Sequence, residues 1–186
     1  MKILILNGSV HGATGNSALL IKKLQKMHKE IEWDVVHLNK TSHSKKLVNR
    51  IEKADALLFL TGTYWDSWGS PLQKFLENIT HLEGDPSIVG KAAGACVLMH
   101  SVGGKEVLSR LQGVLSSMGF LIPPMSGIAH SLSGQLALQR SSKHADDFWS
   151  LDDMDVVIEN LKVAAHGKSK WATWPVDRKN FRKNWL

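Results

Sequence analysis

The sequence predicts an α/β domain in which helices cover both faces of a parallel sheet. Short apolar runs alternate with amphipathic helical patterns along the chain, which is the order of a doubly wound fold. Two of the runs, Ala56–Leu60 and Ala92–Met99, are continuously apolar, as expected for central strands that are buried on both faces. With 186 residues, 43% of them hydrophobic, the chain has the length and the apolar content of one such domain.

Five strands are expected in the sheet. Asp34 and His37 interrupt the second run, which suits an edge strand. Pro123 and Pro124 follow the last run and place it at the other edge, because proline cannot donate to a central ladder. The predicted strands are Lys2–Leu6, Trp33–Leu38, Ala56–Leu60, Ala92–Met99 and Phe120–Ile122.

Helical patterns fill the segments between these strands. Ser70 and Pro71 are typical of a helix N-terminus, and Gly119 ends the apolar stripe that begins at Val107. Further helices are expected at 17–28, at about 43–53, which is polar, and at about 153–165. Residues 126–150 contain Ser and His without clear periodicity, so this stretch is a candidate lid or subunit interface.

The loop after the first strand predicts an anion site. It contains glycine, hydroxyl and amide residues and leads into a helix N-terminus, where unpaired N–H groups and the helix dipole favour a phosphate. Asn16-Ser17 follow Gly15, so this is not a Walker A loop. Val10 follows Gly8 by two residues, so it is not a G-x-G-x-x-G loop either. An ordinary turn capped by Thr14 or Asn16 would fit the same pattern.

Cysteine content and charge exclude several classes of protein. The single cysteine, Cys96, lies in an apolar run and is expected in the core, and one cysteine cannot build a disulfide framework or a cysteine-ligated metal site. We predict no bound metal. The apolar run Met1–Leu6 is too short for a signal peptide or a membrane span, so a cytoplasmic protein is expected.

The positive charge gathers near the C-terminus. The chain carries a net charge of +6, and residues 168–186 contain six Lys or Arg against Asp177. Two parts are therefore expected: a domain over 1–167, and a basic tail over 168–186 that is rich in tryptophan. The tail is expected to pack its aromatic side chains on the domain or on a partner subunit. Binding of nucleic acid or of a membrane surface is the alternative, and nucleic acid is the less favoured partner.

Three loops are expected to meet at one edge of the sheet. Ligands of open parallel sheets bind beyond the carboxyl ends of the strands. The loops that follow the first, third and fourth strands are the anion loop, the aromatic segment Thr61–Gly69 and the glycine-rich segment His100–Gly104. A flat, phosphorylated aromatic cofactor would contact all three.

The order of these segments is that of a known family. Gly8-Ser9 with Gly15-Asn16-Ser17, Thr63-Tyr64-Trp65-Asp66-Ser67 leading into Pro71-Leu72-Gln73-Lys74-Phe75-Leu76, and His100-Ser101-Val102-Gly103-Gly104 together resemble the NADPH-dependent FMN reductase family of flavodoxin-like proteins. The resemblance covers about residues 1–125. His11 stands where the family often has Arg, and Gly62 where it often has Pro. Iron–sulfur flavoproteins, which need clustered cysteines, are excluded.

The resemblance implies a flavodoxin-like five-stranded sheet of order 2-1-3-4-5 and an FMN-dependent oxidoreductase. NADPH or NADH would donate a hydride to the flavin, and a quinone, a flavin or a similar small molecule would accept the electrons. No catalytic side chain is assigned, because the cofactor carries the chemistry. A homodimer is implied. The expected cofactor-binding residues are Ser9, His11, Thr14, Gly15, Asn16, Ser17, Thr63, Tyr64, Trp65, Asp66, Ser67, His100, Ser101, Val102, Gly103 and Gly104.

Two alternatives remain open at this stage. The chain could be an electron carrier that binds flavin without its own NAD(P)H turnover, although carriers of this type tend to have acidic docking faces and residues 1–167 are nearly neutral. Trp65 and Trp68 could pack on the following helix and not on a flavin. Asp66 is expected to be a turn residue.

Overall fold

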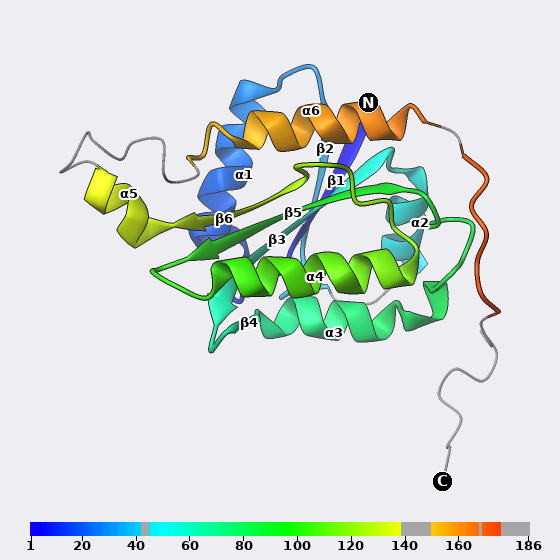
Figure 1. Cartoon of the computed structure of the whole chain (residues 1–186), viewed down its shortest axis with the longest axis horizontal. Coiled ribbons are helices and arrows are strands. Elements are labelled where there is room, and N and C mark those ends of the chain that lie inside the picture. Colours follow the sequence, from blue (N-terminus) through cyan, green and yellow to red (C-terminus); the bar gives the residue numbers. More distant parts are fainter. Residues whose placement is uncertain (42–44, 139–149, 168, 176–186) are drawn as a thin grey trace, which may run out of the picture.

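A six-stranded sheet forms the centre of the computed structural model, which describes residues 1–41, 45–138, 150–167 and 169–175 (Figure 1). Five strands are parallel, in the order β2-β1-β3-β5-β6, and the short β4 pairs antiparallel with β3. This confirms the predicted order of the parallel strands, and β4 is an addition to it. The strands are β1 (Lys2–Asn7), β2 (Glu32–His37), β3 (Ala56–Tyr64), β4 (Ser67–Trp68), β5 (Ala92–Met99) and β6 (Gly127–Ser131).

The prediction of the fifth parallel strand at Phe120–Ile122 is wrong. In that stretch only an isolated bridge forms, between Leu121 and Ala92, while Phe120 is buried in the core. The chain then turns at Met125, where φ is +50°, and enters the sheet as β6. Gly127 opens this strand beneath a helix, where a Cβ atom would lie 2.6 Å from the side chain of Gln112.

Helices cover both faces of the sheet. In Figure 1, α1 (Asn16–Met27) and α6 (Met154–Ala165) lie on one face, and α3 (Ser70–Asn78) and α4 (Gly104–Met118) lie on the other, which α2 (Lys45–Lys53) also covers. The short α5 (Leu132–Leu138) follows β6, and two 3₁₀ turns occur at η1 (Gly12–Thr14) and η2 (Thr80–Leu82). No helix within the described ranges combines the length and the apolar character that a membrane span requires.

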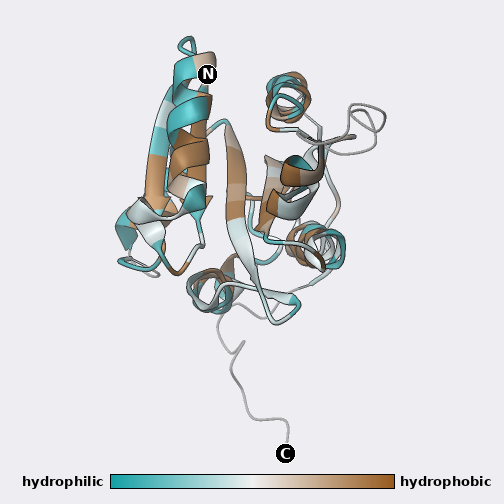
Figure 2. Ribbon diagram, turned by 90° about the vertical axis from the view of Figure 1, so that its left-hand side faces the viewer, coloured by the Kyte–Doolittle hydropathy of each residue, from teal (hydrophilic) through white to brown (hydrophobic). Residues whose placement is uncertain are grey.

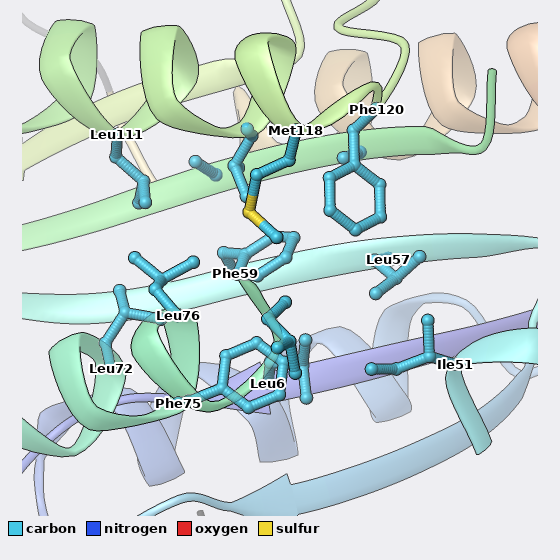
Figure 3. Packing of buried hydrophobic residues seen from close by; sticks show 14 of the residues in the cluster. Leu6, Ile51, Leu57, Phe59, Leu72, Phe75, Leu76, Leu111, Met118 and Phe120 are labelled. Carbon is cyan, nitrogen blue, oxygen red and sulfur yellow. The ribbon is translucent and has the colours of Figure 1, made fainter. Parts of the chain in front are cut away.

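The sheet has a separate hydrophobic core on each face. Figure 2 shows the hydrophobic residues in the strands and on parts of the helices. On the α3–α4 face, Phe59 lies at the centre of the cluster in Figure 3, with its ring 6.4 Å from that of Phe75 and 5.9 Å from that of Phe120. Cys96 is fully buried in the cluster on the other face, as predicted. These two cores hold the carboxyl ends of β1, β3 and β5 side by side.

Candidate functional site

The first loop is held in shape by a buried amide. Asn7, the last residue of β1, is fully buried, and its Oδ1 accepts a hydrogen bond from the backbone N–H of Ser9 at 3.1 Å. Its Nδ2 donates to the carbonyl oxygen of Gly12 at 2.9 Å and lies 2.9 Å from Nδ1 of His37 on β2. One side chain therefore ties the loop to two strands. Asn7 was not among the predicted site residues, although an amide directly after the apolar run Ile3–Leu6 is the signal that could have identified it.

Two glycines let the first loop pack directly against the start of α3. A Cβ atom on Gly8 would lie 2.5 Å from Cβ of Leu72, and a Cβ atom on Gly69 would lie 2.5 Å from the carbonyl oxygen of Gly8. The N–H of Gly8 donates to the carbonyl of Leu60 at 2.7 Å. Residues with side chains at either position would push the two loops apart.

The three loops enclose one pocket of about 200 Å³ at the carboxyl edge of the sheet. Seven of its lining residues are both predicted site residues and polar or aromatic, which confirms that the loops converge. No lysine or arginine is among the lining residues. They are Ser9, His11, Asn16, Ser17, Gly62, Thr63, Tyr64, Leu98, Met99, His100 and Leu132.

Ser17 gives this pocket its clearest ligand-directed group. The residue is 2% exposed, and its Oγ has no hydrogen-bond partner in the described part of the chain. A buried hydroxyl without a partner is costly, and it lies in the first turn of α1, where backbone N–H groups also lack partners within the helix. An anion in the pocket would satisfy both, and the α1 dipole would favour it.

Two serines and an asparagine make this end of the pocket suitable for a phosphate. Ser9 is buried, and its Oγ accepts a hydrogen bond from the N–H of His11 at 3.3 Å. Gly15 brings the backbone close, since a Cβ atom there would lie 2.8 Å from Cβ of His11 and 3.4 Å from Oγ of Ser9. These groups, with Asn16 and Ser17, fit the phosphate of a mononucleotide.

The second loop is a tight hairpin and not an irregular loop. Thr63 pairs with Trp68 and Tyr64 with Ser67, so that Trp65 and Asp66 alone form the turn. Both have positive φ angles, 48° and 54°, a conformation that favours Asn-Gly and is strained for a tryptophan. Trp65 is fully exposed. Asp66 is a turn residue, as expected.

Arg110 on α4 binds this hairpin. The guanidinium of Arg110 donates to the carbonyl oxygen of Asp66 and lies 5.6 Å from the centre of the Trp68 ring. Nε1 of Trp68 donates to Oε1 of Gln73 on α3 at 2.8 Å. Trp68 therefore packs against α3 and α4, which agrees with the alternative that it packs on a helix and not on a flavin. Trp65 instead points into solvent from a hairpin that Arg110 holds in place.

The third loop is held by β6 and α5. The hydroxyl of Ser131 donates to the carbonyl of Ser101 at 3.2 Å, and the N–H of Ser133 donates to the carbonyl of His100 at 2.8 Å. The N–H of Gly104 lies 3.1 Å from Sδ of Met99. This packing brings Leu132 into the pocket. No local sequence signal marked Leu132, because its position depends on how α5 packs on a distant loop.

The remaining predicted site residues lie outside the pocket lining. Several of them shape the loops: Gly103 has φ +85° and precedes α4, close to Oδ1 of Asp66, and the hydroxyl of Thr14 donates to the carbonyl of His11. Val102 is 75% exposed. The residues outside the lining are Thr14, Gly15, Trp65, Asp66, Ser67, Ser101, Val102, Gly103 and Gly104.

Solved structures with the same fold include several flavoproteins. RosB with bound 8-demethyl-8-formylriboflavin-5'-phosphate superposes with a TM-score of 0.70 at 16% identity, covering 89% of this chain and 79% of that one. FerB, an NAD(P)H:(acceptor) oxidoreductase from Paracoccus denitrificans, gives 0.63 at 20% identity, with 88% and 98% covered. The apo NADH:FMN oxidoreductase EMOB gives 0.62 at 19% identity, with 88% of each chain covered.

The family follows from a match over most of the chain. No curated protein matches the sequence. The profile of the NADPH-dependent FMN reductases matches residues 1–133, which contain all three loops of the pocket. The chain therefore belongs to the NADPH-dependent FMN reductase family: it is an FMN-dependent oxidoreductase with NAD(P)H as its electron donor.

Proposed function

We propose that the pocket at the carboxyl edge of the sheet is the FMN site, with the phosphate in the first loop. The observation that carries this proposal is the unpartnered, buried hydroxyl of Ser17, a residue that lines the same pocket as Tyr64 and His100. The lining joins hydroxyl and amide groups of the first loop to aromatic residues of the other two, which suits one ligand with an anionic end and a planar end. Ser9, Asn16 and Ser17 would hold the phosphate, and Tyr64, Met99 and His100 would contact the planar end.

The protein's contribution is to bind and orient, because FMN when bound supplies the hydride acceptance and the electron transfer. The carbonyls of His100 and Ser101 are engaged by α5 and β6, which fixes the third loop, and its backbone N–H groups would be the donors to the polar edge of a bound ring. Such dipoles stabilise negative charge that develops on a bound ring. No side chain is needed to move a proton.

We infer that the electron acceptor is a small planar molecule such as a quinone or free flavin. The rim of the site presents exposed apolar side chains, namely Trp65 at the hairpin tip, Val102 in the third loop and Leu132 on α5. A planar acceptor can lie against such a rim, and an aromatic tip residue gives it a stacking surface. These features favour an enzyme that releases its electrons to a diffusing molecule.

The test is turnover by the purified, FMN-loaded protein. We expect a flavin visible spectrum, release of FMN on denaturation, and aerobic oxidation of NADPH or NADH that is stimulated by benzoquinone or free riboflavin. NADPH and NADH are compared at equal concentration. A yellow protein that oxidises neither donor with any acceptor would be an electron carrier, and the reductase proposal would be wrong.

We further propose that the active form is a homodimer in the cytoplasm, with the exposed face of α5 covered by a second copy. Leu132 and Leu136 lie one turn apart on α5 and are 44% and 50% exposed, so a partner would remove a continuous apolar surface from water. Sedimentation of Leu136→Glu tests this, because a buried charge at the contact should convert dimer to monomer. Asn160→Glu, on α6, is the matched control. Cell fractionation tests the location.

A further inference from the structure

A second cavity lies at the opposite edge of the sheet from the flavin pocket. Its volume is about 340 Å³, compared with about 200 Å³ for the pocket between the three loops. It is formed by residues just before β5, by the end of α4 and the segment after it, and by residues 171–174. Volumes of about 300–1,000 Å³ with apolar linings are typical of small-molecule sites.

Residues 171–174 of the tail close one side of this cavity. Residues 169–175, coloured orange to red in Figure 1, run along the domain past the end of α6. Nε1 of Trp174 donates to Oε1 of Glu83 at 2.8 Å. Trp171 lies on the backbone of Gly90, where a Cβ atom would come within 2.5 Å of its Cδ1. The two indoles are thus positioned by specific contacts with the domain.

Glycine backbone forms much of the opposite wall. Gly84, Gly90 and Gly119 all line the cavity and have positive φ angles of 64°, 75° and 111°. Side chains are strained in this conformation, and at Gly90 a side chain would also collide with the Trp171 indole, so these positions favour glycine. Gly119 is packed so closely that a Cβ atom would lie 2.9 Å from Cγ2 of Val89.

The lining defines the chemistry of a ligand. Val89, Met118, Phe120 and Ile122 provide apolar surface, and the indoles of Trp171 and Trp174 remain 53% and 59% exposed. None of the lining residues is charged, and apart from the indole N–H groups the polar side-chain groups are the hydroxyls of Ser116, Ser117 and Thr173. A charged ligand would lose its hydration there without gaining an ionic partner.

We propose that this cavity binds an uncharged, planar aromatic molecule, which lies against the two indoles and forms a hydrogen bond with a hydroxyl group of the lining. The site is separate from the flavin pocket. Helix α4 joins the two, because it begins beside the third loop at Gly104 and ends in the cavity wall at Met118. Its fifteen residues span about 22 Å, so a ligand in the cavity cannot contact a cofactor held by the three loops.

The test uses 2-naphthol and the full-length protein loaded with FMN. Isothermal titration should show saturable binding of one naphthol per chain, and the flavin visible spectrum should show that no FMN is released. Trp174→Ala should weaken binding about tenfold through the loss of an aromatic contact. Trp33→Phe, which changes an indole on β2, should leave naphthol binding unchanged. The carboxylate analogue 2-naphthoate should bind at least about tenfold more weakly than naphthol.

A second variant, which fills the cavity, distinguishes loss of the binding site from loss of the fold. Ser116→Phe places a ring in the cavity from the exposed last turn of α4, and it should abolish naphthol binding while the thermal midpoint and the FMN spectrum stay those of the parent. Equal binding by Ser116→Phe and the parent would overturn the proposal, and so would displacement of FMN. Binding that appears only in the double variant Phe181→Ala/Trp185→Ala would also overturn it, because the chain's own aromatic residues would then be the occupant.

Discussion

The amide nitrogen of Asn7 lies 2.9 Å from Nδ1 of His37, and this contact joins the first loop to the edge strand β2. Because Nδ2 of Asn7 can only donate, Nδ1 of His37 must accept. The imidazole therefore carries no proton on Nδ1 and is uncharged. The same Nδ2 also donates to Gly12, so the geometry of the anion loop depends on the protonation state of a histidine outside it.

Acidification should therefore destabilise the protein through His37. Partial burial of the ring, and then the charge of Lys40, hold the pKa of His37 below its ordinary value of 6.5. The unfolded chain binds the proton more readily, so this stabilisation is complete above pH 6.5 and is lost as the pH falls below that value towards the lowered pKa. Thermal midpoints of the FMN-free protein should fall between about pH 7 and about pH 5. His37→Asn, whose amide oxygen can still accept from Asn7, should show a shallower fall, and a curve identical to the parent's would contradict this assignment.

Ser17→Ala should separate cofactor binding from folding. The hydroxyl is buried and has no protein partner, so its removal should leave the free energy of unfolding of the FMN-free protein equal to or higher than that of the parent. It should nevertheless raise the dissociation constant of FMN by about 10- to 100-fold, as expected for a lost hydrogen bond to a charged group. Fluorescence titration with FMN measures this. Thr14→Ala is the control, because the Thr14 hydroxyl binds the His11 carbonyl outside the pocket, and equal FMN affinities for the two variants would refute the phosphate site.

Substitutions at the hairpin tip should raise the stability of the protein and, where Trp65 is lost, lower its turnover of acceptor. Asp66→Gly removes one strained residue and keeps the indole, so it should be more stable than the parent and equally active. The double variant Trp65→Asn/Asp66→Gly has the residues that this turn prefers and should gain about 1–2 kcal/mol in urea unfolding. We expect kcat/KM for a quinone to fall in the double variant alone. Retention of full activity would show that Trp65 takes no part in acceptor binding.

Cys96 should be inert in the folded protein. Complete burial raises the pKa of its thiol to about 12, so the reactive thiolate is scarce and inaccessible near neutral pH. Mass spectrometry after treatment with iodoacetamide should find no adduct in native buffer and a single adduct in concentrated urea. Rapid labelling of the native protein would place Cys96 outside the core.

The local pattern of apolar and polar residues was sufficient to predict the strands that are buried because of their own residues. Continuous apolar runs identified β3 and β5, and the polar interruptions of the second run correctly predicted that β2 is an edge strand. The last parallel strand, β6, was missed because Gly127, His130 and Ser131 do not form an apolar run. Gly127 lies against side chains of the neighbouring helix α4, which is a contact between distant segments.

The part of the candidate site that follows from sheet topology was predicted from the sequence. Strands that are parallel bring their following loops to one edge, and so Ser9, Tyr64 and His100 could be expected together. The hairpin was read as a loop because Trp65-Asp66 lacks the usual turn residues. Leu132 and Asn7 depend on tertiary packing and buried hydrogen bonding, which no local pattern encodes.

The contact between Gly8 and Gly69 limits which parts of this enzyme can be changed by substitution. Since neither residue can gain a side chain without displacing the other loop, the phosphate-binding loop and the start of α3 form one mechanical unit. Variation in acceptor preference is therefore expected elsewhere, at the hairpin tip, where Trp65 is exposed. A library confined to the hairpin tip should change acceptor preference without disturbing the bound cofactor.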